Sequence, residues 1–221
     1  MTSGLSREQI AQRAAQELQN GFVVNLGIGI PTLVANYVPP GVEIILHAEN
    51  GVLGCGPLAE DGEEDPDLIN AGAQYITLRP GACCFDSAMS FAMIRGGHLD
   101  MTILGGFQVS RQGDLANWRV PGREYGSIGG AMDLANGAKR VVVTMEHCTK
   151  QGEPKIVAAC SYPLTGIACV DTVITDLAVI TVTPDGLVLR EVAPGVSAHE
   201  VQQLTAAPLR VADDIREMSL G

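Results

Sequence analysis

Short apolar runs without alternating polar residues, several of them closed by glycine, restrict the fold of this chain more than any other feature. A strand that is hydrophobic along its whole length is buried on both faces, as in a parallel sheet covered by helices. Strands are predicted at residues 22–26, 42–47, 73–78, 99–109, 140–147, 155–160 and 171–183. Helical patterns alternate with them, so the sequence predicts an α/β fold with a mixed, mostly parallel sheet flanked by helices.

The predicted helices carry recognisable end signals. The first spans residues 6–21, where Ser6 and Gln9 can form a capping box and Asn20-Gly21 can end the helix. Later helices are expected from Pro31 to about Tyr37, at residues 86–97, from near Ala131, and from the capping residue Ser197.

The connections indicate one continuous unit. Asp185-Gly186 predicts a hairpin turn, which makes the sheet mixed. No repeat or linker divides the chain, so residues 1–221 are expected to form a single domain. The tail after about Pro208 is expected to be loosely held.

Composition and charge narrow the classes of function. Hydrophobic residues make up 46% of the 221 residues, enough for a large core, and the net charge is −11. Such an acidic surface repels phosphate backbones and anionic lipid, so roles on nucleic acid or at a membrane surface are not expected. No apolar run approaches ~18 residues, and the N-terminus lacks the basic start and apolar stretch of a signal peptide.

The cysteines do not suggest a disulfide framework or a metal site. There are six, none in CxxC spacing, and His147-Cys148 is the only close His/Cys pair. A chain with a large core needs no disulfides, so a reducing cytoplasm is the expected location and no bound metal is expected.

Glycines gather just past the ends of predicted strands. They are Gly27 and Gly29; Gly51, Gly54 and Gly56; Gly105 and Gly106; and Gly126, Gly129 and Gly130. In open α/β sheets, ligands bind at the carboxyl ends of the strands, and glycine lets backbone N–H groups approach them closely. The clusters therefore predict a site built from backbone donors.

The segment GIGIPT, residues 27–32, invites comparison with a dinucleotide-binding fingerprint. Thr32 stands at the third glycine position and Pro31 lies inside the motif, which argues against that cofactor. An anion or carbonyl contact at this helix N-terminus and a simple tight turn both remain open.

A second glycine-rich helix start, GSIGGAMDLANG, spans residues 126–137. The N–H groups of Gly130 and Ala131 would have no partner within the helix. They could stabilise a developing oxyanion in acyl transfer, or they could simply begin a helix. The sequence favours neither interpretation.

Glu49 is the remaining candidate for chemistry. It follows the predicted strand at residues 42–47 and precedes Asn50-Gly51, a common turn signal. It is either a solvated turn residue or a nucleophile towards an activated acyl group, and in the second case Gly51, Gly54 and Gly56 would leave room for a bulky substrate. No GxSxG motif offers a serine nucleophile instead.

The segment LHAENGVLG, residues 46–54, resembles the active-site signature of the family I CoA-transferases, Leu-His-Ser-Glu-Asn-Gly-x-x-Gly. The segments NLGIGIPTLVANYV, SFAMIRGGHLD, QVSRQGDLANW and GGAMDL resemble the β subunit of 3-oxoacid CoA-transferases, which is their B-type chain. The similarity covers nearly the whole chain. It implies a fold like that of the ribose-phosphate isomerase and glucosamine-phosphate isomerase group.

This resemblance implies a mechanism. Glu49 would attack an acyl-CoA to form a mixed anhydride and then a glutamyl-CoA thioester, and Gly130 and Ala131 would contact the thioester carbonyl. The residues implied to be structural or close to the substrate are Gly27, Gly29, Asn50 and Gly51. No metal or redox cofactor is implied, because coenzyme A is a substrate.

The resemblance also implies a partner and substrates. The partner is a CoA-transferase α subunit, in a heterotetramer of two α and two β subunits. Succinyl-CoA and acetoacetate are the expected substrates, with 3-oxoadipate as the alternative acid. Ala48 departs from the signature, because it replaces a serine whose hydroxyl could hydrogen-bond near the glutamate.

Two other classes of function remain open. One is a ligand-sensing domain of the same fold in which Glu49 does no chemistry. The other is an isomerase of phosphorylated sugars, which would need Lys or Arg clustered near the strand ends. The candidates for such a cluster are Lys139, Arg140, Lys150 and Lys155, and none lies in a convincing phosphate loop.

Overall fold

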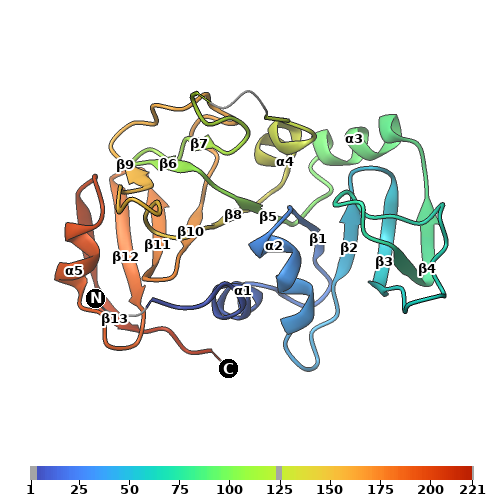
Figure 1. The fold of residues 1–221 in the computed structure, drawn as a ribbon, viewed down its shortest axis with the longest axis horizontal. Helices are drawn as coiled ribbons and strands as arrows, with labels where there is room; N and C mark the ends of the chain where they lie inside the picture. The colour runs from blue at the N-terminus through green and yellow to red at the C-terminus, as the bar shows by residue number, and fades with distance from the viewer. Residues whose placement is uncertain (1–3, 123–125, 221) are drawn as a thin grey trace.

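A computed structural model describes residues 4–122 and 126–220 of the chain (Figure 1). Ten strands form the main sheet: β1 (Val23–Leu26), β2 (Ile45–Ala48), β3 (Val52–Leu58), β4 (Ile76–Cys84), β5 (Met101–Gly105), β8 (Val141–Thr144), β10 (Thr172–Ile174), β11 (Ala178–Thr183), β12 (Gly186–Val192) and β13 (Leu209–Glu217). Their order is β13-β12-β11-β10-β8-β5-β1-β2-β3-β4. Five of the nine neighbouring pairs are parallel and four are antiparallel, so the predicted α/β fold with a mixed sheet is confirmed.

The middle of the sheet is parallel. Strands β2, β1, β5, β8 and β10 lie side by side and point the same way, so their carboxyl ends share one edge. Val24, Ile103 and Val142, from three of these strands, are fully buried. The interpretation of the apolar runs as strands covered on both faces is therefore confirmed for β1, β5 and β8. It is wrong for β2 and β4, because Ile45 and Leu78 are 42% and 39% exposed.

Antiparallel strands extend this parallel core on both sides. Strands β3 and β4 continue the sheet beyond β2, and β11 and β12 continue it beyond β10. The hairpin predicted at Asp185-Gly186 joins β11 to β12, with Thr183 opposite Gly186.

The expectation of a loosely held tail after Pro208 is wrong. Residues Leu209–Glu217 form β13, the edge strand, which pairs in parallel with β12 from Leu187 opposite Leu209 to Val192 opposite Glu217. Most of its side chains are exposed. The sequence therefore carries no apolar run there, and backbone pairing with β12 makes the strand.

Helices cover the central strands. In the described residues they are α1 (Arg7–Ala15), α2 (Ile30–Leu33), the 3-10 helix η1 (Val34–Tyr37), α3 (Ser87–Arg95), α4 (Ala131–Gly137) and α5 (Ala198–Gln203). In Figure 1, α1 and α2 lie below the central strands, and α3 and α4 lie above them. Helix α1 also packs against α2, and α3 packs against α4.

The helix caps agree with the sequence better than the helix lengths do. The capping box of Ser6 and Gln9 is present, and Ser197 caps α5. The first helix ends at Ala15, however, short of the predicted Asn20-Gly21. Its continuation tightens into turns, in which the Glu17 N–H donates to the carbonyl three residues back.

Two predicted strands are each divided. The run at residues 99–109 becomes β5 and β6 (Gln108–Ser110), and β6 lies in a separate three-stranded sheet with β7 (Leu115–Ala116) and β9 (Ile156–Val157). The run at residues 171–183 becomes β10 and β11, because the Thr175 hydroxyl accepts the N–H groups of Leu177 and Ala178 and so closes a turn. Local side-chain hydrogen bonds of this kind compete with strand continuation.

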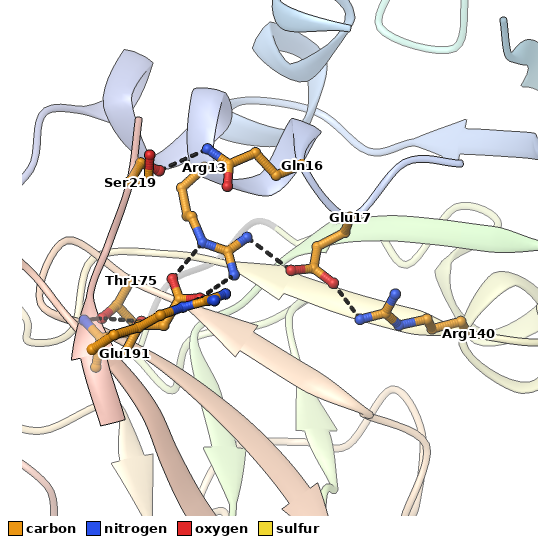
Figure 2. Close-up of polar contacts among 9 residues, drawn as sticks. Arg13, Gln16, Glu17, Arg140, Thr175, Glu191 and Ser219 are labelled. Carbon is orange, nitrogen blue, oxygen red and sulfur yellow. Dashed lines mark hydrogen bonds and ion pairs between the residues drawn. The ribbon is translucent and has the colours of Figure 1, made fainter. Parts of the chain in front are cut away.

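A buried ion network ties the first helix to the end of the chain (Figure 2). Arg13 on α1 donates to both carboxylate oxygens of Glu191 on β12, at 2.6 and 3.0 Å, and to Glu17 at 2.8 Å. Arg216 on β13 donates to Glu191 at 2.7 Å, and Arg140 pairs with Glu17. Burial alone would raise the pKa of Glu191, but the hydrogen bonds from Arg13 and Arg216 hold it below its usual value.

Candidate active site

Glu49 opens a three-residue loop between β2 and β3. The two strands pair antiparallel, with Ala48 opposite Val52, and the Gly51 N–H donates to the Ala48 carbonyl at 3.0 Å. The predicted turn is therefore present. It leaves the half-buried Glu49 at the edge where the parallel strands end.

Asn50 and Gly51 fasten this loop to its surroundings. The Asn50 Nδ2 donates to the carbonyl oxygen of Ile69 at 2.7 Å. Gly51 has a φ of +124°, and a Cβ at this position would lie 2.0 Å from the carbonyl oxygen of Phe85. Only glycine fits there, and both residues serve to hold the shape of the loop.

The expectation that Gly51, Gly54 and Gly56 leave room for a bulky substrate is wrong. A Cβ at Gly54 would lie 3.0 Å from Ala82, and a Cβ at Gly56 would lie 2.4 Å from Thr77 Oγ1. These contacts are with β4, as the contact of Gly51 is with the residue that follows β4. The three glycines therefore let β4 pack closely on β3 and on the loop.

The space beside Glu49 depends instead on the start of α4. A Cβ on Gly130 would lie 3.1 Å from Cγ of Glu49 and 3.2 Å from the ring of Phe91. A glycine at this position lets the N-terminus of α4 lie directly against the Glu49 side chain. The structure thus brings together two of the residues that the sequence singled out.

The two N–H groups expected to be free at this helix start differ. The Ala131 N–H donates to the carbonyl oxygen of Ile128 at 3.0 Å, because the chain makes a tight turn before α4. The prediction of an unsatisfied donor is therefore wrong for Ala131. The Gly130 N–H has no partner among the described residues, and it is the backbone donor of this pair that remains for a ligand.

One cavity of ≈ 480 Å³ is bordered by four of the residues that the sequence singled out, namely Gly27, Glu49, Gly130 and Ala131. It lies beyond the carboxyl ends of β1, β5 and β8, at the edge where open α/β sheets bind ligands. Apolar side chains form much of its wall, among them Leu26, Ile28, Ile30, Leu104 and Phe107. Of the other residues implied to be close to the substrate, Gly29, Asn50 and Gly51 are not part of this wall.

Gly27 and Gly29 shape the turn from β1 into α2. The Gly27 N–H donates to the Ile103 carbonyl at 2.8 Å, and a Cβ on Gly27 would lie 3.2 Å from the same oxygen. Gly29 caps α2 with a φ of +93°. The Thr32 hydroxyl donates to the Gly27 carbonyl at 2.8 Å, so the residue that breaks the dinucleotide fingerprint closes a tight turn.

Asn25 is not singled out by the sequence, yet its side chain reaches Glu49. Its Nδ2 lies 3.4 Å from Glu49 Oε2 and 3.0 Å from the carbonyl oxygen of His47. Asn25 is 1% exposed, and its Oδ1 has no partner among the described residues. The signal that could have revealed it is a lone amide inside the apolar strand at residues 22–26.

His47 lies behind Asn25 and fixes its amide. Its Nδ1 is 3.4 Å from Asn25 Nδ2, its Nε2 is 3.0 Å from Ser90 Oγ, and its ring stacks on Phe85. Burial lowers the pKa of His47 to about 4, so the ring is neutral at neutral pH. A neutral ring that accepts at Nδ1 donates from Nε2, which matches these two neighbours.

The cavity wall also carries a charged cluster. Lys155 and Arg7 lie near Glu146, with N···O distances of 3.7 and 3.8 Å, and all three residues border the cavity. Burial lowers the pKa of Lys155. Thr144, at the end of β8, lies in the same wall, and its Oγ1 has no partner among the described residues.

The described residues hold neither a metal cluster nor a membrane-spanning helix. No group of three or more His, Cys, Asp or Glu side chains in residues 4–122 and 126–220 is placed to hold a metal ion. Within the same ranges, no helix has the length and apolar character needed to cross a bilayer.

A carboxylate on a cavity wall, with an amide beside it and a backbone N–H that has no partner in the described part of the chain, suits nucleophilic attack on an acyl group. Comparison with protein families agrees with this chemistry, because the model described as coenzyme A transferase matches residues 7–204. The chain belongs to the coenzyme A transferase family.

Two bacterial relatives, both named as B-type subunits, cover nearly all of this CoA-transferase chain. The B-type subunit of the 3-oxoadipate CoA-transferase of Acinetobacter baylyi is 54% identical to this chain over 206 residues, which are 93% of this chain and 95% of the relative. The B-type subunit of the probable succinyl-CoA:3-ketoacid coenzyme A transferase of Bacillus subtilis is 54% identical over 210 residues, which are 95% of this chain and 97% of the relative. The resemblance to a B-type, or β, subunit is therefore confirmed.

The fold agrees with a solved CoA-transferase structure. An acyl-CoA transferase of Escherichia coli O157:H7 matches 98% of this chain and 44% of its own, with a TM-score of 0.79 and 23% identity. At that identity the likeness concerns the fold alone, and it confirms the predicted CoA-transferase fold.

Proposed function

We propose that this CoA-transferase subunit moves coenzyme A between succinyl-CoA and acetoacetate through a thioester on Glu49. The observation that carries the proposal is the setting of Glu49, which borders the cavity with the Asn25 amide at 3.4 Å and Gly130 against its Cγ. The names of the two relatives support the class of reaction, since both are subunits of CoA-transferases.

The reaction proceeds by two exchanges at Glu49. A carboxylate oxygen of Glu49 attacks the thioester carbonyl of succinyl-CoA, and the CoA thiolate leaves. The thiolate then attacks the Glu49 carbonyl of the resulting anhydride, which releases succinate and leaves glutamyl-CoA. Acetoacetate reacts with this thioester by the same two steps in reverse, which yields acetoacetyl-CoA and free Glu49.

Each attack places negative charge on a carbonyl oxygen. The Gly130 N–H is the backbone donor available to stabilise that charge. Asn25, whose amide is fixed by His47, holds the Glu49 carboxylate in one orientation. The apolar side chains of the wall keep water scarce, which protects the anhydride and the thioester from hydrolysis.

A partner chain, the α subunit, completes the site in this proposal, in an assembly of two α and two β subunits. Ile28 and Phe107 both border the cavity, and they are 74% and 38% exposed. Large apolar side chains exposed at the mouth of a cavity suit coverage by another chain. The naming of both relatives as B-type chains supports this pairing, because it implies an A-type counterpart.

3-Oxoadipate is the second candidate acid. One relative belongs to a 3-oxoadipate CoA-transferase, and the other belongs to a probable succinyl-CoA:3-ketoacid transferase, at the same 54% identity. Turnover of the complete complex with succinyl-CoA and each acid in turn decides between them.

The nucleophile is tested by mass spectrometry of the complex after incubation with succinyl-CoA. CoA should be found on Glu49, and borohydride should reduce that thioester and inactivate the enzyme. Glu49→Gln should abolish the adduct and lower turnover by more than roughly 1,000-fold, whereas Glu60→Gln, on an exposed loop, should change neither. Normal turnover of Glu49→Gln refutes the nucleophile, and a wild-type complex that forms no adduct favours the ligand-sensing alternative.

A further inference from the structure

We infer that Lys155 and Arg7 form a subsite for the second carboxylate of a dicarboxylic acyl group, such as succinyl or 3-oxoadipyl. The inference rests on the proposed function and deepens it, because it names the part of the cavity that selects the acid.

The position of the cluster relative to Glu49 follows from the strand order. Glu49 comes directly after β2, and the Lys155 N–H donates to the His147 carbonyl at 3.0 Å, just beyond the end of β8. Strands β2 and β8 are separated by β1 and β5, which makes three strand spacings, about 14 Å in all. Both residues border the same cavity, so an acyl group bound there can lie between the Glu49 carboxylate and the Lys155 ammonium group.

The two cations have hydrogen-bonding capacity to spare. Their contacts with Glu146, at 3.7 and 3.8 Å, are longer than the roughly 2.7–2.9 Å of a charge-assisted hydrogen bond. A lysine has three donors and an arginine five, and one carboxylate cannot occupy them all. This part of the wall therefore carries two positive charges against the single negative charge of Glu146.

Other nearby groups do not remove this excess of donors. Asp176 also acts electrostatically on Lys155, but it does not border the cavity, and its Oδ1 accepts the His147 N–H at 2.6 Å. Thr144 adds a neutral donor, since it is 1% exposed, borders the cavity and has an Oγ1 without a partner among the described residues.

Burial makes an anionic ligand favourable here. The Lys155 side chain is only 12% exposed, and a buried ammonium group is costly unless it is paired and hydrogen-bonded. A carboxylate placed between Lys155 and Arg7 would supply the close contacts that Glu146 does not. The thioester end of the same acyl group would then lie towards Glu49.

The phosphates of CoA carry the same kind of charge, so the test keeps CoA constant and changes the acyl group. The complex with the α subunit is mixed with succinyl-CoA or with butyryl-CoA, which has a methyl group in place of the second carboxylate. The rate of CoA-adduct formation on Glu49 is followed by intact mass, which also measures slow reactions. The variants are Lys155→Met and Arg7→Met, with Lys150→Met, an exposed lysine outside the cavity wall, as the matched control.

Lys155→Met should slow adduct formation from succinyl-CoA by roughly 10- to 100-fold, the usual effect of losing a hydrogen bond to a charged group, and should leave butyryl-CoA within about 3-fold. Arg7→Met should show the same selectivity with a smaller loss, because its side chain is 60% exposed. Lys150→Met should change neither rate. Lys155→Arg, which keeps the charge, should restore most of the preference for succinyl-CoA.

The outcomes separate the subsite from the proposed function. Equal losses with both thioesters would mean that Lys155 holds CoA or the fold, and an unchanged rate with succinyl-CoA would mean that it binds nothing in this step; either result overturns the subsite. If Lys155→Met does not assemble, Arg7→Met at the solvent-exposed start of α1 decides the question. A wild-type complex that forms no adduct from either thioester refutes the proposed function itself.

Discussion

Replacing Arg13 with methionine tests how the first helix is held to the strands near the end of the chain. Methionine is also a good helix former and has a long side chain, but it cannot make the hydrogen bonds of Arg13 to Glu191 and Glu17 (Figure 2). Glu191 is 3% exposed, so it cannot turn to water instead. The substitution therefore leaves a buried carboxylate with fewer partners.

The expected loss follows from the partners that remain. Removing one member of a buried ion pair typically costs about 3–5 kcal/mol, because the other charge stays buried and uncompensated. Glu191 keeps Arg216 at 2.7 Å, and Glu17 keeps Arg140. The lower end of the range, about 3 kcal/mol of unfolding free energy, is therefore expected for Arg13→Met.

A double substitution separates the charge from the packing. Arg13→Met with Glu191→Met removes both buried charges, and apolar replacement of a buried pair is often close to neutral. The double variant should therefore lose less than half of what Arg13→Met loses. Arg216 then loses its partner, at little cost because its side chain is 75% exposed.

The assay is urea unfolding followed by circular dichroism, with every variant in the same state of assembly. Arg95→Met is the control, because Arg95 forms an exposed pair with Asp133 and its loss should change the free energy of unfolding little. If Arg13→Met cost no more than Arg95→Met, or if the double variant lost the sum of its single substitutions, burial would not be what makes this network costly to break.

Three further substitutions test the site and the core. Gly51→Ala should destabilise the protein by more than about 2 kcal/mol in urea unfolding, because its Cβ would overlap the Phe85 carbonyl at a φ that favours glycine. Gly130→Ala should keep the fold but slow adduct formation at least roughly 10-fold, because the new methyl group presses on Glu49. Burial lowers the pKa of His147 to about 4, so on acidification the imidazole is protonated in the unfolded chain before it is protonated in the folded protein. The free energy of unfolding should therefore fall as the pH decreases from about 6.5 towards 4. His147→Asn, measured by unfolding at each pH, should flatten that dependence.

Each of these expectations has a clear contrary result. A Gly51→Ala protein as stable as the wild type would mean that the loop can move away from Phe85. Normal adduct formation by Gly130→Ala would mean that the contact with Glu49 does not matter for the reaction. An unchanged pH profile in His147→Asn would assign the acid sensitivity to other groups, such as His47, whose pKa burial also lowers to about 4.

The sequence predicts those parts of the fold in which the type of side chain depends on burial or on helix capping. The parallel strands are recognisable because they are apolar on both faces, and Ser6 and Ser197 mark helix starts because their hydroxyls satisfy free N–H groups. Strand β13 has no apolar pattern that would predict it, since its side chains are mostly exposed and it is held by backbone pairing with β12.

The site is predicted where its chemistry is local and missed where it depends on strand order. Glu49 is found because it stands in a recognisable segment at a strand end. Asn25 reaches the cavity from β1, and Lys155 reaches it from beside the end of β8. No short segment of sequence specifies that β1 and β8 flank β5 in the sheet. Pairing of strands distant in sequence is a property of the folded chain, so these residues gain their meaning only in three dimensions.

The glycines show why the same residue type predicts a close contact but not the neighbour in that contact. Glycine is needed wherever another group lies closer than a Cβ allows. That group is β4 or the residue after it at Gly54 and Gly51, the β5 backbone at Gly27, and the Glu49 side chain at Gly130. Their number predicts a site built from backbone donors, but most of these glycines serve strand packing. The polar side chains on the wall of this cavity, such as Asn25, Glu49 and Lys155, come instead from separate segments of the chain, and Gly130 lies against one of them.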